Sequence, residues 1–211
     1  MFIFNPINNV MKKTRKPQQK RSKQKVDRII KSARKLFSKN GYAKTTMSLI
    51  AREAGVSIGT AYAYFADKDE LLQEVLRQHI EEILCPAEKI MDELSANANI
   101  EKTLKKLISC FIKVHKIEPG LQNIFFEKRI TDNEFKTFVV EYRERGRQIG
   151  RRLIERFANR KVKRSKEAAA QVIVGLLDFC THIGTAFPSE ITIEQACKIG
   201  VEMIVSYFKD E

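Results

Sequence analysis

Apolar residues recur at helical spacing along most of the chain, and no segment shows the alternation that is typical of a strand. The first clear segment has apolar residues at i, i+3, i+4 and i+7 spacing, namely Val26, Ile29, Ile30, Ala33, Leu36 and Phe37. Asn40 and Gly41 follow, and a glycine at this place favours the left-handed conformation that ends a helix. The pattern therefore predicts a helix that begins at Val26 and ends at the Asn40-Gly41 pair.

Two short helices are predicted directly after the first one. Thr46 can cap a helix that ends at Gly55, and Ser57 can cap the next helix, which runs to Phe65. The apolar positions of the earlier helix are Leu49, Ile50, Ala51 and Ala54. Two short helices separated by about three residues, with glycine in the turn, are typical of a helix-turn-helix.

The rest of the chain is also predicted to be helical. Asp67 and Glu70 form a D-x-x-E capping box, which opens a long helix that should run to Cys85. Pro86 should kink or interrupt that helix. Further helical segments are expected at about 100–117, 121–130, 133–158, 166–186 and 193–208. The segment at about 166–186 is apolar nearly all round, so it must be buried. The fold class is therefore all-α.

Charge is distributed unevenly over the 211 residues. The formal net charge is +13, of which +11 falls on residues 1–80 and only +2 on residues 81–211. Residues 12–25 hold eight basic residues and no apolar residue that could anchor them, so we expect a flexible arm. A basic N-terminal part followed by a nearly neutral remainder indicates a polyanionic partner for the N-terminal part alone.

Several classes of protein are not supported by the sequence. Glycine-rich phosphate loops, paired carboxylates facing a histidine and nucleophile–base motifs are absent, so we expect no enzyme and no cofactor. The three histidines are widely separated, with neither a carboxylate nor a cysteine at ligand spacing nearby, so we expect no metal site. The four cysteines (Cys85, Cys110, Cys180 and Cys197) form no C-x-x-C pair and fit reduced, packed thiols.

The chain is expected to be cytoplasmic. Its first ten residues lack basic residues before their apolar part, as a signal peptide would require, and Met11 is an alternative natural start. No run approaches the roughly 18 apolar residues of a membrane span. We therefore expect no membrane partner.

The segment from Thr45 to Leu71 carries many fixed spacings at once. It reads TTMSLIAREAGVSIGTAYAYFADKDEL, and its pattern TT…IA..AGVS.GT.Y.YF..K.EL resembles the DNA-binding signature of the tetracycline-repressor (TetR) family. The resemblance covers about residues 26–72 and implies an N-terminal three-helix DNA-binding domain followed by a helical domain for effector binding and dimerisation. The expected organisation is a basic arm at 1–25, a helix-turn-helix domain at 26–72 and the effector and dimerisation domain at 73–211.

The resemblance, together with the outward positions of the third helix, predicts the DNA contacts. By similarity, Thr46, Tyr62 and Lys68 hold the DNA backbone, and Lys68 stands at a helix N-terminus, which favours phosphate. The full predicted set is Thr46, Ser48, Ser57, Ile58, Gly59, Thr60, Tyr62, Ala63, Tyr64 and Lys68. Because Ser48 and Ala63 are smaller than is frequent in the family, we expect sparse base readout, with DNA shape and the arm adding to binding. The alternatives are that Tyr62 and Tyr64 are partly buried aromatics and that the arm is a solvated tail.

The remaining helices are expected to bind an effector and to dimerise. Aromatic and polar side chains that could line a cavity for a small lipophilic effector are Phe111, His115, Phe125, Phe126, Phe138, Tyr142, Phe179 and His182. The alternative for each of them is ordinary core packing. An arginine-rich run at 143–164 favours a solvated face, with an acidic effector as its alternative.

Glycines in the two C-terminal helices, Gly175, Gly184 and Gly200, suit close helix crossing in a homodimer or within one chain. The resulting hypothesis is a repressor that binds a palindromic operator on double-stranded DNA as a homodimer. An effector would shift the long helix after Asp67. This shift would change the separation between the helix-turn-helix domains of the two copies from about 34–36 Å, which is one DNA turn. The alternative function is a non-specific architectural DNA-binding protein.

Overall fold

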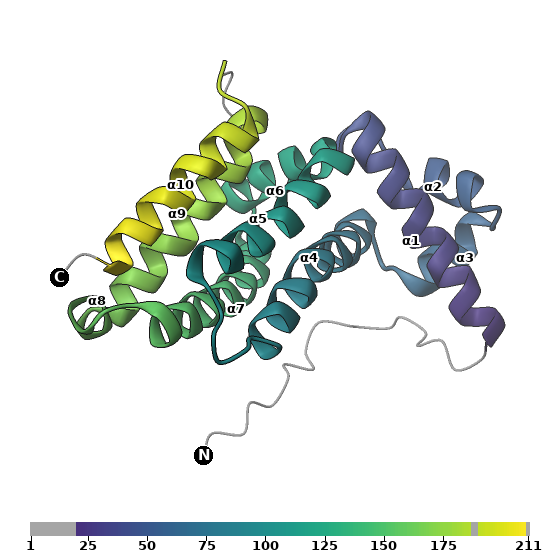
Figure 1. Cartoon of the computed structure of the whole chain (residues 1–211). Helices are drawn as coiled ribbons and strands as arrows, with labels where there is room; N and C mark the ends of the chain where they lie inside the picture. The colour runs from purple at the N-terminus through teal and green to yellow at the C-terminus, as the bar shows by residue number, and fades with distance from the viewer. Residues whose placement is uncertain (1–19, 187–189, 210–211) are drawn as a thin grey trace. The chain divides into compact units, whose positions relative to one another are not determined.

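The computed structural model describes residues 20–186 and 190–209, and all its regular elements are α-helices (Figure 1). The all-α prediction is confirmed. The chain forms two compact units, which divide between Leu76 and Arg77. In the described part of the chain, no helix is both long enough and apolar enough to cross a membrane.

The first unit contains α1 (Lys20–Asn40), α2 (Met47–Ala54), α3 (Ile58–Tyr64) and the start of α4 (Lys68–Asp92). Its core is formed by side chains that are almost fully buried, among them Ile29, Ala33, Phe37, Ile50, Ala61 and Leu71. Gly41 has a φ of +77° and ends α1 in the left-handed conformation, as predicted.

Helix α1 begins six residues earlier than expected. Residues 20–25, which were assigned to the flexible arm, are the first turn and a half of the helix. They contain lysine, arginine and glutamine, which have good helix propensity, and they lie beyond Pro17. The remainder of the predicted arm, residues 1–19, lies outside the described residues.

Helix α4 continues past Pro86 to Asp92, so the expected interruption at Cys85 is wrong. The predicted cap at its start is present, because the Asp67 carboxylate accepts the Glu70 N–H at 2.8 Å. The Glu70 carboxylate accepts the N–H of Ala66, one residue before the cap, at 2.6 Å. Pro86 cannot donate a backbone hydrogen bond. The turns after it are nevertheless anchored, because Ala87 and Met91 are buried.

The second unit contains the rest of α4 and six further helices. They are α5 (Ile100–Ile117), α6 (Pro119–Thr131), α7 (Asn133–Phe157), α8 (Arg160–Arg164), α9 (Lys166–Ala186) and α10 (Ile193–Lys209). Helix α9 packs against both α7 and α10 (Figure 1). The short α8 was not predicted; Asn159 caps it, and Val162 buries its apolar side.

Helix α9, whose apolar pattern predicts burial somewhere, is only partly buried within the single chain. Val172 is 67% exposed and Phe179 is 49% exposed. Helix α9 buries only the sides that face its neighbours, with Ala170, Ile173 and Leu177 among the buried residues. The apolar pattern indicates that a surface is available for burial, but it does not say which partner covers that surface.

Candidate DNA-binding surface and ligand cavity

Side-chain caps fix the turn between α2 and α3. Thr46 caps α2 by accepting the Leu49 N–H at 3.2 Å, and Ser57 caps α3 by accepting the Thr60 N–H at 3.1 Å. Gly55 has a φ of +63°, so it supplies the left-handed residue that ends α2. The local signals in the sequence therefore produce the predicted turn.

The buried side of this motif determines which residues of α3 face outward. Ala51, Ala61 and Phe65 are buried. The opposite side of α3 exposes Ile58 (48%) and Tyr62 (49%). Gly59 and Ala63 are also exposed, whereas Thr60 and Tyr64 are half-buried. Thr46 and Ser48 are exposed on α2. Tyr62 is half exposed and Tyr64 is half-buried, so the alternative of partly buried aromatics stays open for both.

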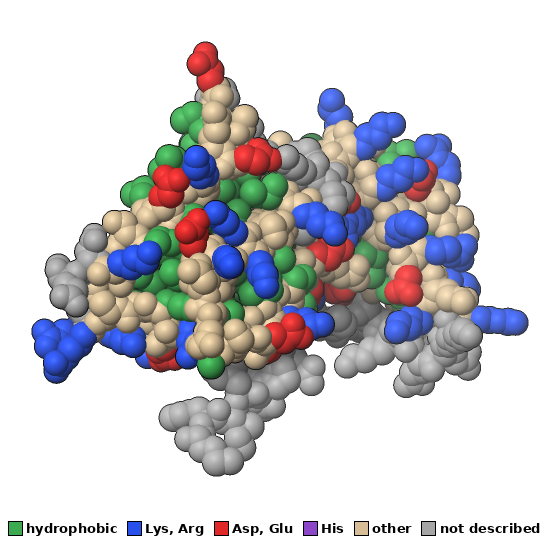
Figure 2. All heavy atoms as spheres, in the orientation of Figure 1, with side chains coloured by type: hydrophobic (Ala, Val, Ile, Leu, Met, Phe, Trp, Pro, Cys, Tyr) green, Lys and Arg blue, Asp and Glu red, His purple; other side chains and the backbone are tan. Residues whose placement is uncertain are grey.

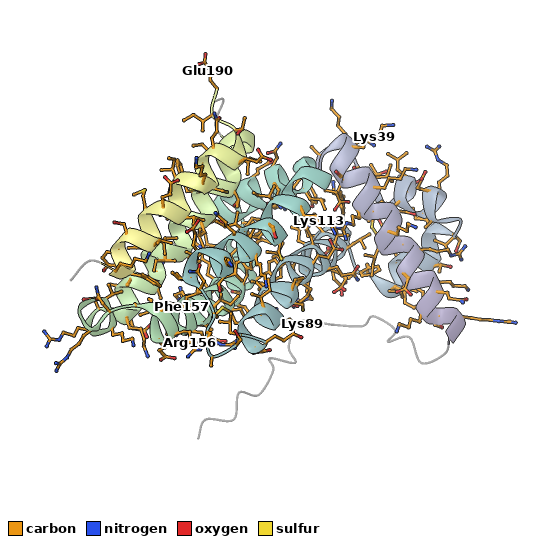
Figure 3. All side chains as sticks on the ribbon, viewed as in Figure 1. Lys39, Lys89, Lys113, Arg156, Phe157 and Glu190 are labelled. Carbon is orange, nitrogen blue, oxygen red and sulfur yellow. The ribbon has the colours of Figure 1, made fainter. Side chains whose placement is uncertain are left out.

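The same unit exposes many basic side chains on α1. Lys and Arg side chains cover α1 in Figure 2, and Figure 3 labels Lys39 in the last turn of that helix. The exposed cations of α1 are Arg21, Lys23, Lys25, Arg28, Lys31, Lys35 and Lys39. Lys35 forms an exposed ion pair with Glu53 at 2.6 Å. A surface of this kind attracts a polyanion.

Lys68 has a role that the sequence did not indicate. Its ammonium donates to the carbonyl oxygens of Tyr42 and Thr45, both at 2.9 Å, and lies 3.9 Å from the centre of the Tyr42 ring. Lys68 therefore holds the loop that leads into the cap of α2. An ammonium has three N–H groups, so a third remains to donate to a phosphate.

The second unit contains a cavity of about 100 Å³ between α5, α6, α7 and α9. Three of the predicted aromatic residues line it: Phe111, Phe125 and Tyr142. The Phe125 and Tyr142 rings meet edge to face at 5.8 Å. Other apolar lining residues are Leu84, Leu107, Ile149, Leu153, Ile173, Val174 and Leu177.

The other predicted effector residues are not found in this lining. Phe138 packs against Phe135 at 5.2 Å and below the guanidinium of Arg77. Phe179 lies on the exposed side of α9. The side chains of His115, Phe126 and His182 lie outside the described residues.

Glycines and polar groups of the cavity were missed. Gly146, Gly150 and Gly175 line it, together with the polar residues Arg143, Arg147, Gln171 and Asp178. A Cβ on Gly150 would lie 3.1 Å from Val174 Cγ2, so the glycines allow α7 to approach α9 closely. The four-residue spacing of Gly146 and Gly150 in a helix was the available signal.

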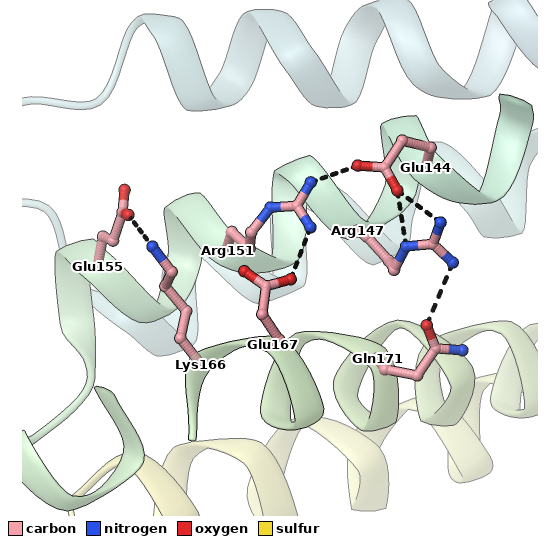
Figure 4. Close-up of polar contacts among 7 residues, drawn as sticks. All are labelled: Glu144, Arg147, Arg151, Glu155, Lys166, Glu167 and Gln171. Atoms are coloured by element: carbon pink, nitrogen blue, oxygen red, sulfur yellow. Dashed lines mark hydrogen bonds and ion pairs between the residues drawn. The ribbon is translucent and has the colours of Figure 1, made fainter. Parts of the chain in front are cut away.

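Part of the arginine-rich run is paired and not simply solvated. Arg147 donates to Glu144 at 2.9 Å and to Gln171 at 3.3 Å, and Arg151 binds both Glu144 and Glu167 (Figure 4). Hydrogen bonds from Arg151 and then from Arg147 lower the pKa of Glu144. This network joins α7 to α9 beside the cavity.

A second arginine joins α7 to α4. Arg145 donates to Glu81 at 2.5 Å and to Glu88 at 2.9 Å, and it is 27% exposed. The hydrogen bond from Arg145 is the main reason why the pKa of Glu81 is lowered. The Cys85 thiol also donates to Glu81, at 2.9 Å, and this bond raises the pKa of the thiol.

The expectation that no carboxylate lies at ligand spacing from a histidine is wrong for His79. His79 and Glu82 lie three residues apart on α4, and Glu118 precedes the first turn of α6. One ligand atom from each of these three residues lies within 4.8 Å of the others. The spacing of His79 and Glu82 was visible in the sequence, whereas the position of Glu118 follows from the packing.

Comparison with known proteins gives a consistent result. Residues 29–75 match the model of bacterial regulatory proteins of the tetR family. The HTH-type transcriptional regulator YhgD of Bacillus subtilis is 33% identical over 90 residues, which cover 42% of this chain and 47% of the relative. The fatty acid metabolism regulator protein of Bacillus subtilis is 26% identical over 130 residues, which cover 62% of each chain. The chain thus spans less than two thirds of the length of these relatives.

The similarity in fold extends further than the similarity in sequence. The solved structure of the fatty acid degradation regulator FadR from Bacillus halodurans has a TM-score of 0.68 and 20% identity, covering 93% of this chain and all of that one. The relatives are named as regulators and not as enzymes. Residues 29–75 therefore form a DNA-binding domain of the tetR family of bacterial regulatory proteins, within an all-α fold that the chain shares with solved transcriptional regulators.

Proposed function

We propose that the chain represses transcription by binding a palindromic operator as a homodimer, and that a small lipophilic effector releases it. The observation that carries the proposal is the outward side of α3, where Ile58 and Tyr62 are half exposed on a helix without charged residues. Hydroxyl and apolar groups suit phosphates and thymine methyl groups. The basic α1 in the same unit supplies the attraction to DNA that does not depend on sequence.

The apolar surface of α9 and α10 supports the homodimer. Hydrophobic side chains lie at the surface over these helices in Figure 2. The large exposed apolar residues there are Val172, Phe179, Ile199, Met203 and Tyr207. A Cβ on Gly175 would meet no heavy atom within 4 Å, whereas one on Gly200 would lie 3.0 Å from Cys180 Sγ. Gly200 therefore serves packing within the chain, and the exposed apolar residues are what support the homodimer.

The chemistry of the cavity supports a fatty acid or a derivative of one as the effector. Aromatic and aliphatic groups form most of its wall, and its polar lining residues are Arg143, Arg147, Gln171 and Asp178, of which Arg147 is already paired with Glu144. Two similar proteins are named as regulators of fatty acid metabolism or degradation. Because ligand sites typically measure about 300–1,000 Å³, the cavity of about 100 Å³ must widen on binding.

Helix α4 is the proposed link between the effector and DNA. It contributes Leu84 to the cavity wall, and Arg145 ties its Glu81 and Glu88 to α7. The same helix begins at Lys68, which holds the loop before α2. A ligand that widens the cavity would move α7 relative to α4 and so favour a conformation with lower DNA affinity.

Selection of bound duplexes from a random-sequence pool, at two salt concentrations, tests the proposed DNA binding. We expect a palindrome with half-sites about one DNA turn apart, bound specifically at the higher salt. Flat enrichment, with binding that collapses as salt rises, would instead favour the architectural DNA-binding protein.

Two matched variants test the surface itself. Ile58→Ala removes an apolar side chain from α3, and Ile191→Ala removes one of nearly equal exposure, 48% against 49%, from outside the DNA-binding unit. We expect only Ile58→Ala to weaken binding to the selected palindrome. Equal affinities for the two variants would remove α3 from the proposed interface. Addition of a fatty acid to the wild-type complex then tests release.

A further inference from the structure

The polar cluster around His79 is the most unusual buried feature of the second unit. His79 is 2% exposed and Gln122 is 4% exposed. The two side chains meet at 2.5 Å between His79 Nε2 and Gln122 Nε2. On the other side of the ring, the buried Nδ1 lies 3.6 Å from Glu118 Oε2. The imidazole is thus held between an amide and a carboxylate.

We propose that His79, Glu82 and Glu118 form a binding site for a divalent transition metal ion, with Zn²⁺ as the probe. One imidazole nitrogen and two carboxylates are a common ligand set for zinc, and water can complete the coordination. The three residues come from α4 and from the residue before α6, and their ligand atoms lie within 4.8 Å of one another.

Gln122 completes the arrangement around the metal ligands. Histidines that bind metals usually donate their second N–H to a neighbouring oxygen, which fixes the orientation of the ring. Gln122 Nε2 faces His79 Nε2 in the structure, so this arrangement requires the Gln122 amide to flip, which brings its oxygen to the Nε2 proton. The lone pair of Nδ1 then points toward the carboxylate of Glu118.

The distances fit a site that closes slightly around the ion. With zinc–ligand bonds of about 2.1 Å, ligand atoms in a tetrahedral site are separated by about 3.4 Å. The 3.6 Å between His79 Nδ1 and Glu118 Oε2 is close to this value. Glu82 is exposed, so its flexible side chain can approach without moving the core.

Charge also favours a cation at this place. Two carboxylates and an imidazole lie within 4.8 Å, and Glu118 has a side chain that is only 17% exposed. The two negatively charged carboxylates repel each other in this partly buried position, and a bound divalent cation would offset the charge of both carboxylates. The bound ion would connect α4 to the beginning of α6.

Competition for Zn²⁺ between the full chain, with metal removed beforehand, and a chromophoric chelator tests the proposal. We expect one tight equivalent for the wild type and binding at least about tenfold weaker for the Glu82→Gln/Glu118→Gln double variant. Glu141→Gln, which removes an exposed carboxylate of α7 outside the cluster, should bind like the wild type. Urea denaturation without metal verifies that each variant is folded.

Substitution with Co²⁺ provides a second readout. Nitrogen and oxygen ligands give visible d–d bands without the thiolate charge-transfer band that Cys85 or Cys110 would add. The proposal is overturned by a wild type that binds no Zn²⁺, by a double variant that binds as tightly as the wild type, or by a thiolate band. None of these measurements involves DNA, so their outcome is independent of the proposed repressor function.

Discussion

Gly59 lies on the exposed side of α3, where a Cβ would meet no heavy atom within 4 Å. Gly59→Ala therefore adds no steric conflict within the chain, and we expect the free energy of unfolding to rise by up to about 1 kcal/mol. If the backbone of α3 approaches DNA closely, the added methyl group should lower operator affinity about tenfold, or 1.4 kcal/mol. Urea denaturation and fluorescence anisotropy measure the two effects separately. A variant that is more stable and binds DNA as well as the wild type would argue against close approach at Gly59.

Gly150 and Gly175 form a matched pair of helical glycines. A Cβ on Gly150 would lie 3.1 Å from Val174 Cγ2 and 3.3 Å from the Ala170 carbonyl oxygen, whereas one on Gly175 has open space. We expect Gly150→Ala to lower the free energy of unfolding by about 1–3 kcal/mol, because α7 must move away from α9. Gly175→Ala should raise it by up to about 1 kcal/mol. Urea denaturation at one fixed protein concentration measures the free energy of unfolding of both variants. Equal changes in this free energy would contradict the close crossing of α7 and α9 at Gly150.

Residues that act through local contacts were predictable, and residues that act over long range were not. The caps at Thr46 and Ser57 each accept a backbone N–H three residues later, so sequence spacing reveals them. Lys68 binds carbonyl groups 23 and 26 residues earlier, which no local pattern encodes. Phe125 and Phe138 have similar helical surroundings in the sequence. Only the packing of α6 and α7 puts Phe125 beside the cavity and Phe138 outside it.

Helix boundaries were predictable where a cap or a proline fixes them. Helix α5 spans 100–117 as expected, with Asn99 as its N-cap and Pro119 after its end. Helix α4 continues through Pro86 because tertiary burial of the following turn outweighs the lost hydrogen bond. Helix α8 has only five residues, too few for an apolar period to be recognised. These misses occur where packing prevails over local sequence preference.

The link between α4 and α7 should depend on Arg145. Because this guanidinium binds two carboxylates in a partly buried position, we expect Arg145→Gln to lower the free energy of unfolding by about 1–2 kcal/mol at pH 7. The control is Arg152→Gln on the same helix, which removes one exposed ion pair with Asp92 and should cost less than about 1 kcal/mol. Urea denaturation of both variants measures the difference, and equal losses would contradict a special role for Arg145.

The loss of stability in Arg145→Gln should depend on pH. The pKa of Glu81 lies below its ordinary value of 4.5 in the folded chain, mainly because Arg145 donates to it. A lowered pKa in the folded state adds stability above pH 4.5, and that contribution is lost as the pH falls through the folded-state pKa. The difference in stability between wild type and Arg145→Gln should therefore shrink in acid. A difference that stays constant from pH 7 to pH 3 would show that Glu81 is not the coupled group.

At the scale of the whole molecule, the basic surface of α1 and the exposed apolar surface of α9 and α10 belong to different units. The cations of α1 lie in the first unit, whereas the exposed apolar residues of α9 and α10 lie in the second. In the proposed homodimer, operator binding would require both the basic surface and the apolar surface, because each copy would supply one helix-turn-helix and the shared interface would set their spacing. Loss of either surface should therefore weaken operator binding, but only loss of the first should leave the dimer intact.

Met203 provides the test of this separation, because it is 55% exposed on α10 within the proposed dimer surface. A carboxylate there would be desolvated at the centre of an apolar interface, so we expect Met203→Glu to yield monomers in analytical ultracentrifugation. Val140→Glu introduces the same charge at an apolar residue of α7 that is 61% exposed, and it should leave the assembly unchanged. The monomeric variant should still bind a single half-site weakly, because α2 and α3 form their turn within one chain. If Met203→Glu sedimented as a dimer with full operator affinity, α10 would be excluded as the dimer surface, and the exposed residues of α9 and α10 would need a different partner.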